Sequence, residues 1–178
     1  MKYTNKKGLL RNLANIENEK VLLVFESLKV SKRVEELLEK PVKIKNSNWL
    51  VKIHHHLFQD VYEWAGQVRT VNISKDGKPF FNGERLYIGF QYIDTLISEY
   101  RKLKKTNKVE IAKKLAEILD NVNYLHPFRE GNGRTQREFL RLLALEKGLN
   151  LNLNPPDDKS IYEKYMKGTI ESNVEILT

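Results

Sequence analysis

The chain has 178 residues, of which 40% are hydrophobic, and this suffices for the buried core of one domain. It has no cysteine, which excludes disulfides, thiolate metal ligands and a cysteine nucleophile, and suits a reducing cytoplasm. The formal net charge is +8, but lysine and arginine are interleaved with glutamate and aspartate, which indicates solvated helix surfaces. The polar amino terminus and the short apolar runs predict neither a signal peptide nor a membrane span.

Apolar residues recur at helical spacing in the first third of the chain. We predict short helices near residues 17–28 and 31–39, and a longer helix that starts at Asn46 or Ser47 and stops at Gly66. His54 to His56 are consecutive in this helix, so their side chains point in three directions and cannot bind one metal ion together.

The segment VRTVNISKDGKPFFNG, residues 68–83, breaks the helical pattern. Short β-prone runs flank Asp76 and Gly77, a pair that suits a two-residue hairpin turn because both residues tolerate positive φ. Pro79 has no N–H to donate, so its strand should be an edge. We predict a small hairpin over about residues 70–82, and the residues leave open whether it is a binding flap or a surface connection.

Helical periodicity then resumes and continues to the end of the chain. The residues therefore predict an all-α protein with one small hairpin, folded as a single domain over residues 1–178 with its core at about 17–168. The further helices are expected after Gly83, from about Ile111 to Leu125, from about Gly133 to Gly148, and near residues 157–168.

The motif HPFREGNGRTQR, residues 126–137, combines groups that suit phosphate chemistry. A glycine-rich loop enters a helix amino terminus, where free N–H groups bind phosphate oxygens, and Arg134 and Arg137 add charge one turn apart. Glu130 is a hard oxygen ligand suited to Mg²⁺. His126 can accept a proton near neutral pH. Together these groups predict a site for phosphoryl or nucleotidyl transfer.

This motif resembles the Fic family signature, H-x-F-x-[D/E]-G-N-G-R-x-x-R, at every specified position. Residues 56–75 are similar to the family's segment that leads into its flap, and residues 137–148 to the helix after the motif. The resemblance implies one all-α Fic domain, a helical bundle with a small β-hairpin flap. It also implies transfer of AMP from ATP to a serine, threonine or tyrosine hydroxyl of a target protein, with Mg²⁺ and release of pyrophosphate.

The resemblance also implies a role for each motif residue. His126 would deprotonate the target hydroxyl, and Glu130 would hold the metal. Phosphate would be held by the amides of Gly131, Asn132 and Gly133, the Asn132 side chain, and the guanidinium groups of Arg134 and Arg137. The flap would pair main chain to main chain with an extended target segment. Its candidate residues are Ile73, Ser74, Lys75, Asp76, Gly77 and Phe81.

Several other activities must be weighed against AMP transfer. Family relatives that phosphorylate their targets carry lysine where this chain has Gly133, which disfavours a kinase. Transfer of UMP or phosphocholine on the same fold stays open, as does a catalytically silent module that binds phosphate or nucleic acid. The chain lacks a base-reading helix and an aromatic stacking platform, so nucleic acid is not an expected partner.

Fic proteins are commonly restrained by a helix with the pattern [S/T]-x-x-x-E-[G/N], whose glutamate pairs with the second signature arginine, here Arg137. Ser31 and Glu35 keep the interval but are followed by another glutamate, and Ser172 and Glu175 are one residue too close. We therefore expect restraint in trans by a small antitoxin, which would give the chain a toxin-like role in the cytoplasm. Self-inhibition by an irregular terminal helix is the alternative.

Overall fold

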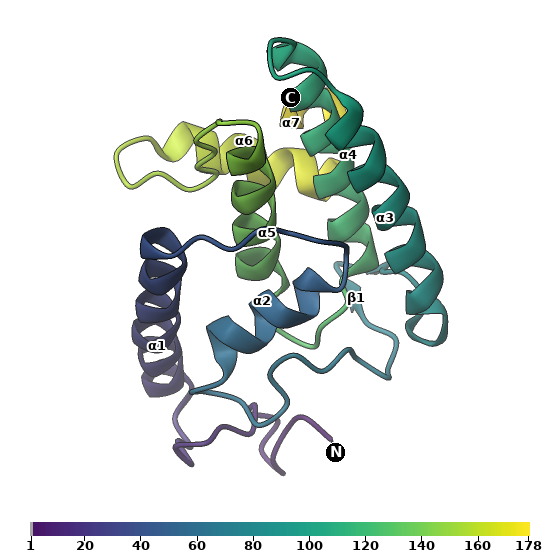
Figure 1. The fold of residues 1–178 in the computed structure, drawn as a ribbon. Coiled ribbons are helices and arrows are strands. Elements are labelled where there is room, and N and C mark those ends of the chain that lie inside the picture. Colours follow the sequence, from purple (N-terminus) through teal and green to yellow (C-terminus); the bar gives the residue numbers. More distant parts are fainter. Residues whose placement is uncertain (1) are drawn as a thin grey trace.

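The computed structural model describes residues 2–178 and shows helices packed around one central helix, with a small hairpin at one side (Figure 1). The hairpin pairs β1 (Ser74–Lys75) with β2 (Lys78–Pro79) in antiparallel register. A 3-10 turn, η1 (Gly83–Arg85), follows it. The α-helices within residues 2–178 are α1 (Glu19–Glu39), α2 (Trp49–Phe58), α3 (Leu86–Lys102), α4 (Lys108–Leu125), α5 (Asn132–Glu146), α6 (Lys159–Glu171) and α7 (Val174–Leu177).

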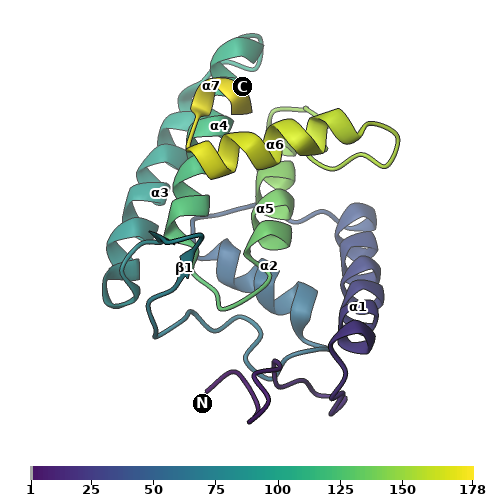
Figure 2. The same cartoon turned by 180° about the vertical axis from the view of Figure 1, so that it is seen from behind.

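The central helix is α5, which packs against both α2 and α4. Helix α1 lies on α2, α3 lies along the outer side of α4, and α6 and α7 also pack against α4 (Figures 1 and 2). The side chains of Phe139, Leu142 and Leu143 in α5 are buried, as the sequence predicted. This arrangement leaves the amino-terminal end of α5 beside the hairpin and α6. No helix of residues 2–178 is both long and apolar enough to cross a bilayer.

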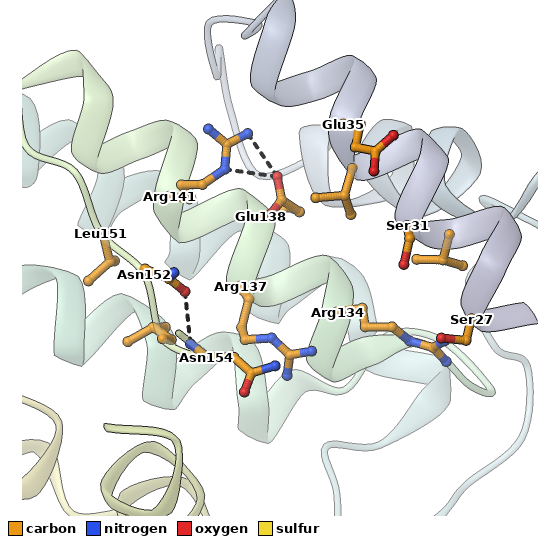
Figure 3. Close-up of a pocket in the computed structure, with 13 residues that line it drawn as sticks. Ser27, Ser31, Glu35, Arg134, Arg137, Glu138, Arg141, Leu151, Asn152 and Asn154 are labelled. Atoms are coloured by element: carbon orange, nitrogen blue, oxygen red, sulfur yellow. Dashed lines mark hydrogen bonds and ion pairs between the residues drawn. The ribbon is translucent and has the colours of Figure 1, made fainter. Parts of the chain in front are cut away.

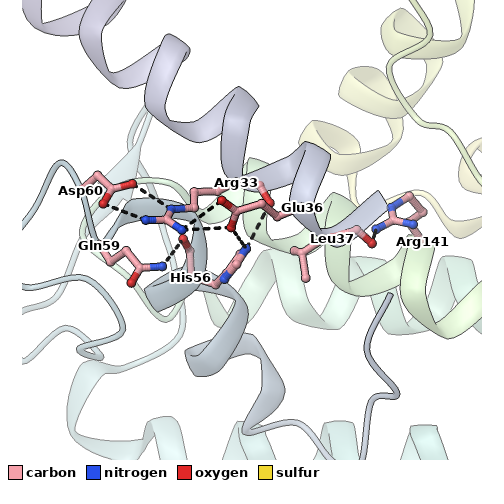
Figure 4. A network of polar contacts seen from close by, with 7 residues as sticks. All are labelled: Arg33, Glu36, Leu37, His56, Gln59, Asp60 and Arg141. Carbon is pink, nitrogen blue, oxygen red and sulfur yellow. Dashed lines mark hydrogen bonds and ion pairs between the residues drawn. The ribbon is translucent and has the colours of Figure 1, made fainter. Parts of the chain in front are cut away.

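The first two predicted helices, at 17–28 and 31–39, are one continuous helix, α1. No glycine or proline interrupts the chain between them, and Val30 at the expected break is buried. Arg33 ties α1 to the end of α2 because its guanidinium bonds Asp60 at 2.8 Å and Glu36 at 2.9 Å (Figure 4). The Asp60 bond thus holds the second half of α1 against the end of α2.

Helix α2 is shorter than predicted, since it ends at Phe58 instead of near Gly66. Val61 and Trp64 are buried as their spacing suggested, but they reach the core from turns that follow the helix. Gly66 has φ +76°, and a Cβ atom there would lie 2.7 Å from the Cβ atom of His55. Gly66 is therefore needed where this turn packs back against α2.

The remaining elements agree more closely with the sequence. Asn82 caps η1 by accepting the N–H of Glu84, and α4 runs directly into His126. Helix α6 extends to Glu171, three residues beyond the predicted end, and α7 was not predicted. The hairpin turn is confirmed, because Asp76 and Gly77 have φ angles of 50° and 77°.

We predict that the same leucine-to-alanine substitution will lower the free energy of unfolding much more at a buried position than at an exposed one. Leu143→Ala, at a side chain with no exposure, should lower the free energy of unfolding by about 2–5 kcal/mol because it leaves a cavity. Leu28→Ala, at a side chain that is 69% exposed, should change it by about 0.5 kcal/mol or less. Urea unfolding of both variants measures the difference. Equal losses would contradict the packing described for α5.

Candidate active site

A cavity of about 700 Å³ lies between the hairpin, the loop at 126–131, the first turns of α5, and α6. It brings together groups that are far apart in sequence, because the hairpin, the loop before α5 and helix α6 all contribute residues to its lining. Its lining contains the sequence-predicted residues Lys75, Asp76, His126, Glu130, Asn132, Gly133 and Arg137. It also contains residues the sequence did not single out, among them Phe80, Gln136, Tyr162, Tyr165, Met166 and Thr169.

His126 forms the carboxyl-terminal cap of α4 in a left-handed conformation, with φ 44° and ψ 60°. Its Nδ1 atom lies 3.0 Å from the carbonyl oxygen of Asn123. A carbonyl can only accept, so Nδ1 carries the hydrogen and the neutral ring keeps a free lone pair on Nε2. The ring of Phe80 stacks on the imidazole at 3.7 Å between centroids. The hairpin therefore covers one face of the candidate base.

Burial lowers the pKa of His126 to about 4. The hydrogen bond to Asn123 opposes this effect, whereas the positive charges of Arg69 and Lys75 add to it. The imidazole is therefore neutral at physiological pH and able to accept a proton.

The loop before α5 uses some of its polar groups to hold itself in place. The carboxylate of Glu130, which lines the cavity, accepts the N–H of Gly131 at 2.9 Å through Oε1, and Oε2 forms no hydrogen bond among residues 2–178. The Asn132 side chain accepts the N–H of Phe128 and donates to its carbonyl, each at 2.9 Å. The Gly131 amide and the Asn132 side chain, both expected at a phosphate, are thus engaged within the loop.

Glycine is present at the two motif positions for different physical reasons. Gly131 has φ +80°, and a Cβ atom there would lie 2.4 Å from the ring of Phe58, so this position is dictated by packing. At Gly133 the nearest atom to an added Cβ would be Nη1 of Arg137 at 3.5 Å, which is ordinary contact. Packing does not demand glycine here. Its absent side chain leaves the first-turn N–H groups of α5 open to the cavity.

The two signature arginines lie in different surroundings. Arg137 lines the cavity, lies near the rings of Tyr162 and Tyr165 at 5.9 and 5.7 Å, and forms no ion pair with the carboxylates of residues 2–178. Arg134 is absent from the cavity lining. Its Nη2 atom lies 2.5 Å from the buried carboxylate of Glu26 in α1. The resemblance placed the two arginines at the β and γ phosphates, and in the structure only Arg137 lines this cavity, whereas Arg134 is paired with α1.

A second cavity of about 390 Å³, which we call the α1–α5 groove, lies on the other side of α5 (Figure 3). Ser27, Ser31 and Glu35 of α1 face α5 across it. From α5 come Arg134, Arg137, Glu138 and Arg141, and from the following loop Leu151, Asn152, Leu153 and Asn154. Arg137 borders both cavities.

The predicted hairpin residues divide into two groups. Lys75 and Asp76 line the cavity, whereas Ile73, Ser74, Gly77 and Phe81 are outside its lining in the described chain. Phe81 is part of the hairpin's base, where its N–H donates to the carbonyl of Tyr124 at 3.0 Å. Its neighbour Phe80 is the residue that contacts His126. Period-two alternation could have distinguished the two phenylalanines, but it could not show which face meets the histidine.

The consecutive histidines point in three directions, as predicted, and one of them supports the site. His55 faces the carbonyl of Ala65, and His56 faces that of Arg33. His54 is fully buried, donates through Nε2 to the carbonyl of Glu130 at 3.0 Å and accepts the N–H of Gly66 at 2.8 Å. It thus connects the turn after α2 to the signature loop. In the sequence, His54 lies on the same helix face as the apolar residues Leu50 and Leu57, and this spacing could have predicted its burial.

The sequence is similar to one known family and to several known proteins. A profile described as the Fic/DOC family matches residues 44–144. Protein adenylyltransferase VbhT of Bartonella schoenbuchensis is 33% identical over 93% of this chain, and probable protein adenylyltransferase y4lH of Sinorhizobium fredii is 33% identical over 89%. The chain spans 34% of the first protein's length and 82% of the second's.

The fold has a counterpart among solved structures. The BepC protein of Bartonella tribocorum, crystallised with bound AMPPNP, superposes with a TM-score of 0.81 and is 20% identical in sequence. The match covers 99% of this chain and 92% of that one. The predicted all-α fold with a small hairpin is confirmed.

We predict that His54 makes the stability of the fold depend on pH. Burial lowers its pKa from 6.5 to about 4, so the unfolded chain gains a proton near pH 6.5 that the folded chain gains only near pH 4. The free energy of unfolding should therefore fall as pH drops through this window, by up to about 3 kcal/mol from this group. In denaturant titrations, His54→Gln should flatten the fall, and the control His55→Gln should keep it. An unchanged slope in His54→Gln would contradict the neutral buried imidazole.

Proposed function

The chain belongs to the Fic/DOC family, and from this premise we propose that it transfers AMP from ATP to a hydroxyl side chain of a target protein and releases pyrophosphate. The observation that carries the proposal is the shared cavity of His126 and the open first turn of α5. Relatives named protein adenylyltransferase support the same reaction. The need for ATP and the lack of cysteine support a cytoplasmic site of action.

The chemistry begins at Nε2 of His126, which accepts the proton of a serine, threonine or tyrosine hydroxyl. The hydroxyl oxygen bonds to the α-phosphorus of ATP as the bond from that phosphorus to the bridging oxygen of the β-phosphate breaks, and pyrophosphate leaves. A bound triphosphate places negative charge beside the imidazole. This charge raises the pKa of His126 toward neutrality, where the ring is a stronger base.

Mg²⁺ fits the residues at the mouth of the cavity. Glu130 offers a carboxylate oxygen there, since only Oε1 is engaged by the loop. Carboxylate oxygen and phosphate oxygens are the ligands that this ion prefers, so Glu130 is the proposed protein ligand. When bound, the ion neutralises charge on the phosphates and orients them.

The phosphates are proposed to run from the His126 cavity past Arg137. The α-phosphate would lie at the N–H groups of Asn132 and Gly133, at the positive end of the α5 dipole. Arg137 borders both cavities and would therefore hold the β-phosphate. Arg134, with one edge held by Glu26, would meet the γ-phosphate at the groove.

The hairpin is the proposed docking site of the target. Both of its strands are exposed, so their free main-chain groups can pair with an extended segment of another protein. Phe80 and Lys75 at the cavity would place this segment next to His126. Ile73, Ser74, Asp76 and Gly77 complete the proposed surface.

Restraint in trans by a small antitoxin is supported by the α1–α5 groove. Glu35 lines it, yet no carboxylate of residues 2–178 forms an ion pair with Arg137. Val24 and Leu28, which are 59% and 69% exposed, continue the Ser31–Glu35 face of α1 at helical spacing. An amphipathic helix with apolar residues toward α1 and a glutamate toward Arg137 fits this surface.

We predict that purified protein with Mg²⁺ and ATP labels itself or proteins of a lysate from ATP labelled in the α-phosphate. Label from the γ-phosphate alone would reject AMP transfer and indicate a kinase. His126→Ala should abolish transfer and keep the affinity for an ATP analogue within about threefold, because the base acts at the chemical step. The control is His55→Ala, an exposed histidine outside the cavity. Loss of nucleotide affinity in His126→Ala would assign this residue a structural role.

For control in trans, we predict that the isolated chain is active and that Glu35→Gly, Glu171→Gly and Glu175→Gly leave its rate of AMP transfer within about twofold of wild type. These glutamates are exposed and form no ion pair with Arg137 in the described residues. Initial rates at saturating ATP measure the effect. Activation of about tenfold or more in any one variant would mean that the chain restrains itself.

A further inference from the structure

Arg69 is a buried arginine whose partners are backbone carbonyls. Its side chain is 1% exposed, and no acidic side chain of residues 2–178 forms an ion pair with it. Its guanidinium donates to the carbonyls of His126 at 2.7 Å, Val71 at 2.7 Å, Leu125 at 3.2 Å, and Phe81. A buried charge is costly unless it is hydrogen-bonded, and here each of the three guanidinium nitrogens donates to at least one of the four carbonyls.

The four carbonyls belong to two separate parts of the site. Val71 and Phe81 are at the two ends of the hairpin, where it leaves and rejoins the body of the protein. Leu125 and His126 are the end of α4 and its cap. The backbone N–H of Arg69 also donates to the carbonyl of Pro127 at 2.8 Å. One residue therefore fastens the base of the hairpin to the start of the signature loop.

The hairpin needs such an attachment because it has little structure of its own. Each strand has two residues, and an isolated two-stranded hairpin is marginal in water. Its position over His126 is set at its base, where the Phe81 N–H donates to Tyr124 and its carbonyl accepts from Arg69. The stacking of Phe80 on the imidazole follows from the position of this base.

The histidine depends on the same guanidinium. A left-handed backbone is unfavourable for a residue with a side chain, so the surroundings must hold it. The bond from Nε of Arg69 to the His126 carbonyl fixes the peptide group that follows the imidazole. Lysine cannot replace this group, since a single ammonium lacks the planar fork that reaches both parts.

We propose that Arg69 is a positioning residue that couples the hairpin to His126, so that the covering flap and the proton acceptor are held or released together. The coupling itself is independent of the reaction. Its consequence for catalysis rests on the proposed function, because only a transfer reaction needs a target segment on the hairpin and a base beneath it at the same time.

The first test uses hydrogen exchange of the unmodified chain without nucleotide. The amides of Arg69, Phe81 and His126 are each hydrogen-bonded to backbone carbonyls, so their exchange reports opening. Coupling predicts one shared opening, with the same free energy and the same dependence on denaturant for all three amides. Exchange of Phe81 through a separate, lower-energy opening would overturn the proposal.

The second test compares Arg69→Lys with Arg101→Lys. Arg101 serves as the control because its guanidinium also donates to backbone carbonyls, those of Lys45 at 3.0 Å and of Ile44, outside the cavity lining, although it is exposed and also pairs with Glu146. Arg69→Lys should speed exchange in residues 71–81 and 125–128 together by roughly tenfold to a hundredfold. Arg101→Lys should leave both segments unchanged. Faster exchange in only one segment, or in neither, would reject the coupling.

A kinetic measurement separates this inference from the proposed function. Arg69→Lys should lower kcat for AMP transfer by roughly tenfold to a hundredfold and leave KM for ATP within about twofold, because the phosphate-binding turn of α5 is untouched. If wild type transfers AMP and Arg69→Lys transfers it equally well, the positioning role is wrong. If wild type shows the shared opening but transfers no AMP, the proposed function fails and the coupling stands.

Discussion

The left-handed turn at His126 determines where the other groups of the site lie. It ends α4, points the imidazole back to the carbonyl of Asn123 and turns its own carbonyl toward Arg69. Pro127 prevents the helix from continuing, and the chain then needs only a short loop to begin α5 at Asn132. A proton acceptor and a helix amino terminus are thereby placed in one cavity, which is the arrangement that AMP transfer requires.

Uncompensated positive charge is the second feature that shapes the site. Arg69 and Arg137 have no carboxylate partner within residues 2–178, and Lys75 approaches the cavity from the hairpin. Burial, with the charges of Arg69 and Lys75, lowers the pKa of His126 and favours a neutral imidazole before ligand binds. The same positive groups favour a polyanion, whose phosphates would raise the proton affinity of His126. By contrast, Arg134 is already paired with Glu26. The structure thus assigns different electrostatic environments to two arginines that a sequence motif treats alike.

Helix ends and turns that depend on neighbouring residues could be predicted from the sequence, whereas contacts between distant segments could not. The end of α4 at His126, the opening of α5 and the turn at Asp76 follow from local residue chemistry, and the structure agrees. The motif alone could not show that Glu26 would hold Arg134, because α1 meets α5 only in the folded protein. The role of Arg69 could not be predicted either, because the sequence does not distinguish a buried arginine that binds carbonyls from a solvent-exposed one.

A crystal structure with Mg²⁺ and a non-hydrolysable ATP analogue would test most directly whether the cavity at His126 holds the triphosphate of ATP. We expect the α-phosphate at the first turn of α5, with Nε2 of His126 facing its open side. We also expect Mg²⁺ on a carboxylate oxygen of Glu130, and Arg137 on the β-phosphate. Phosphates bound elsewhere, for example wholly within the α1–α5 groove and away from His126, would contradict this arrangement.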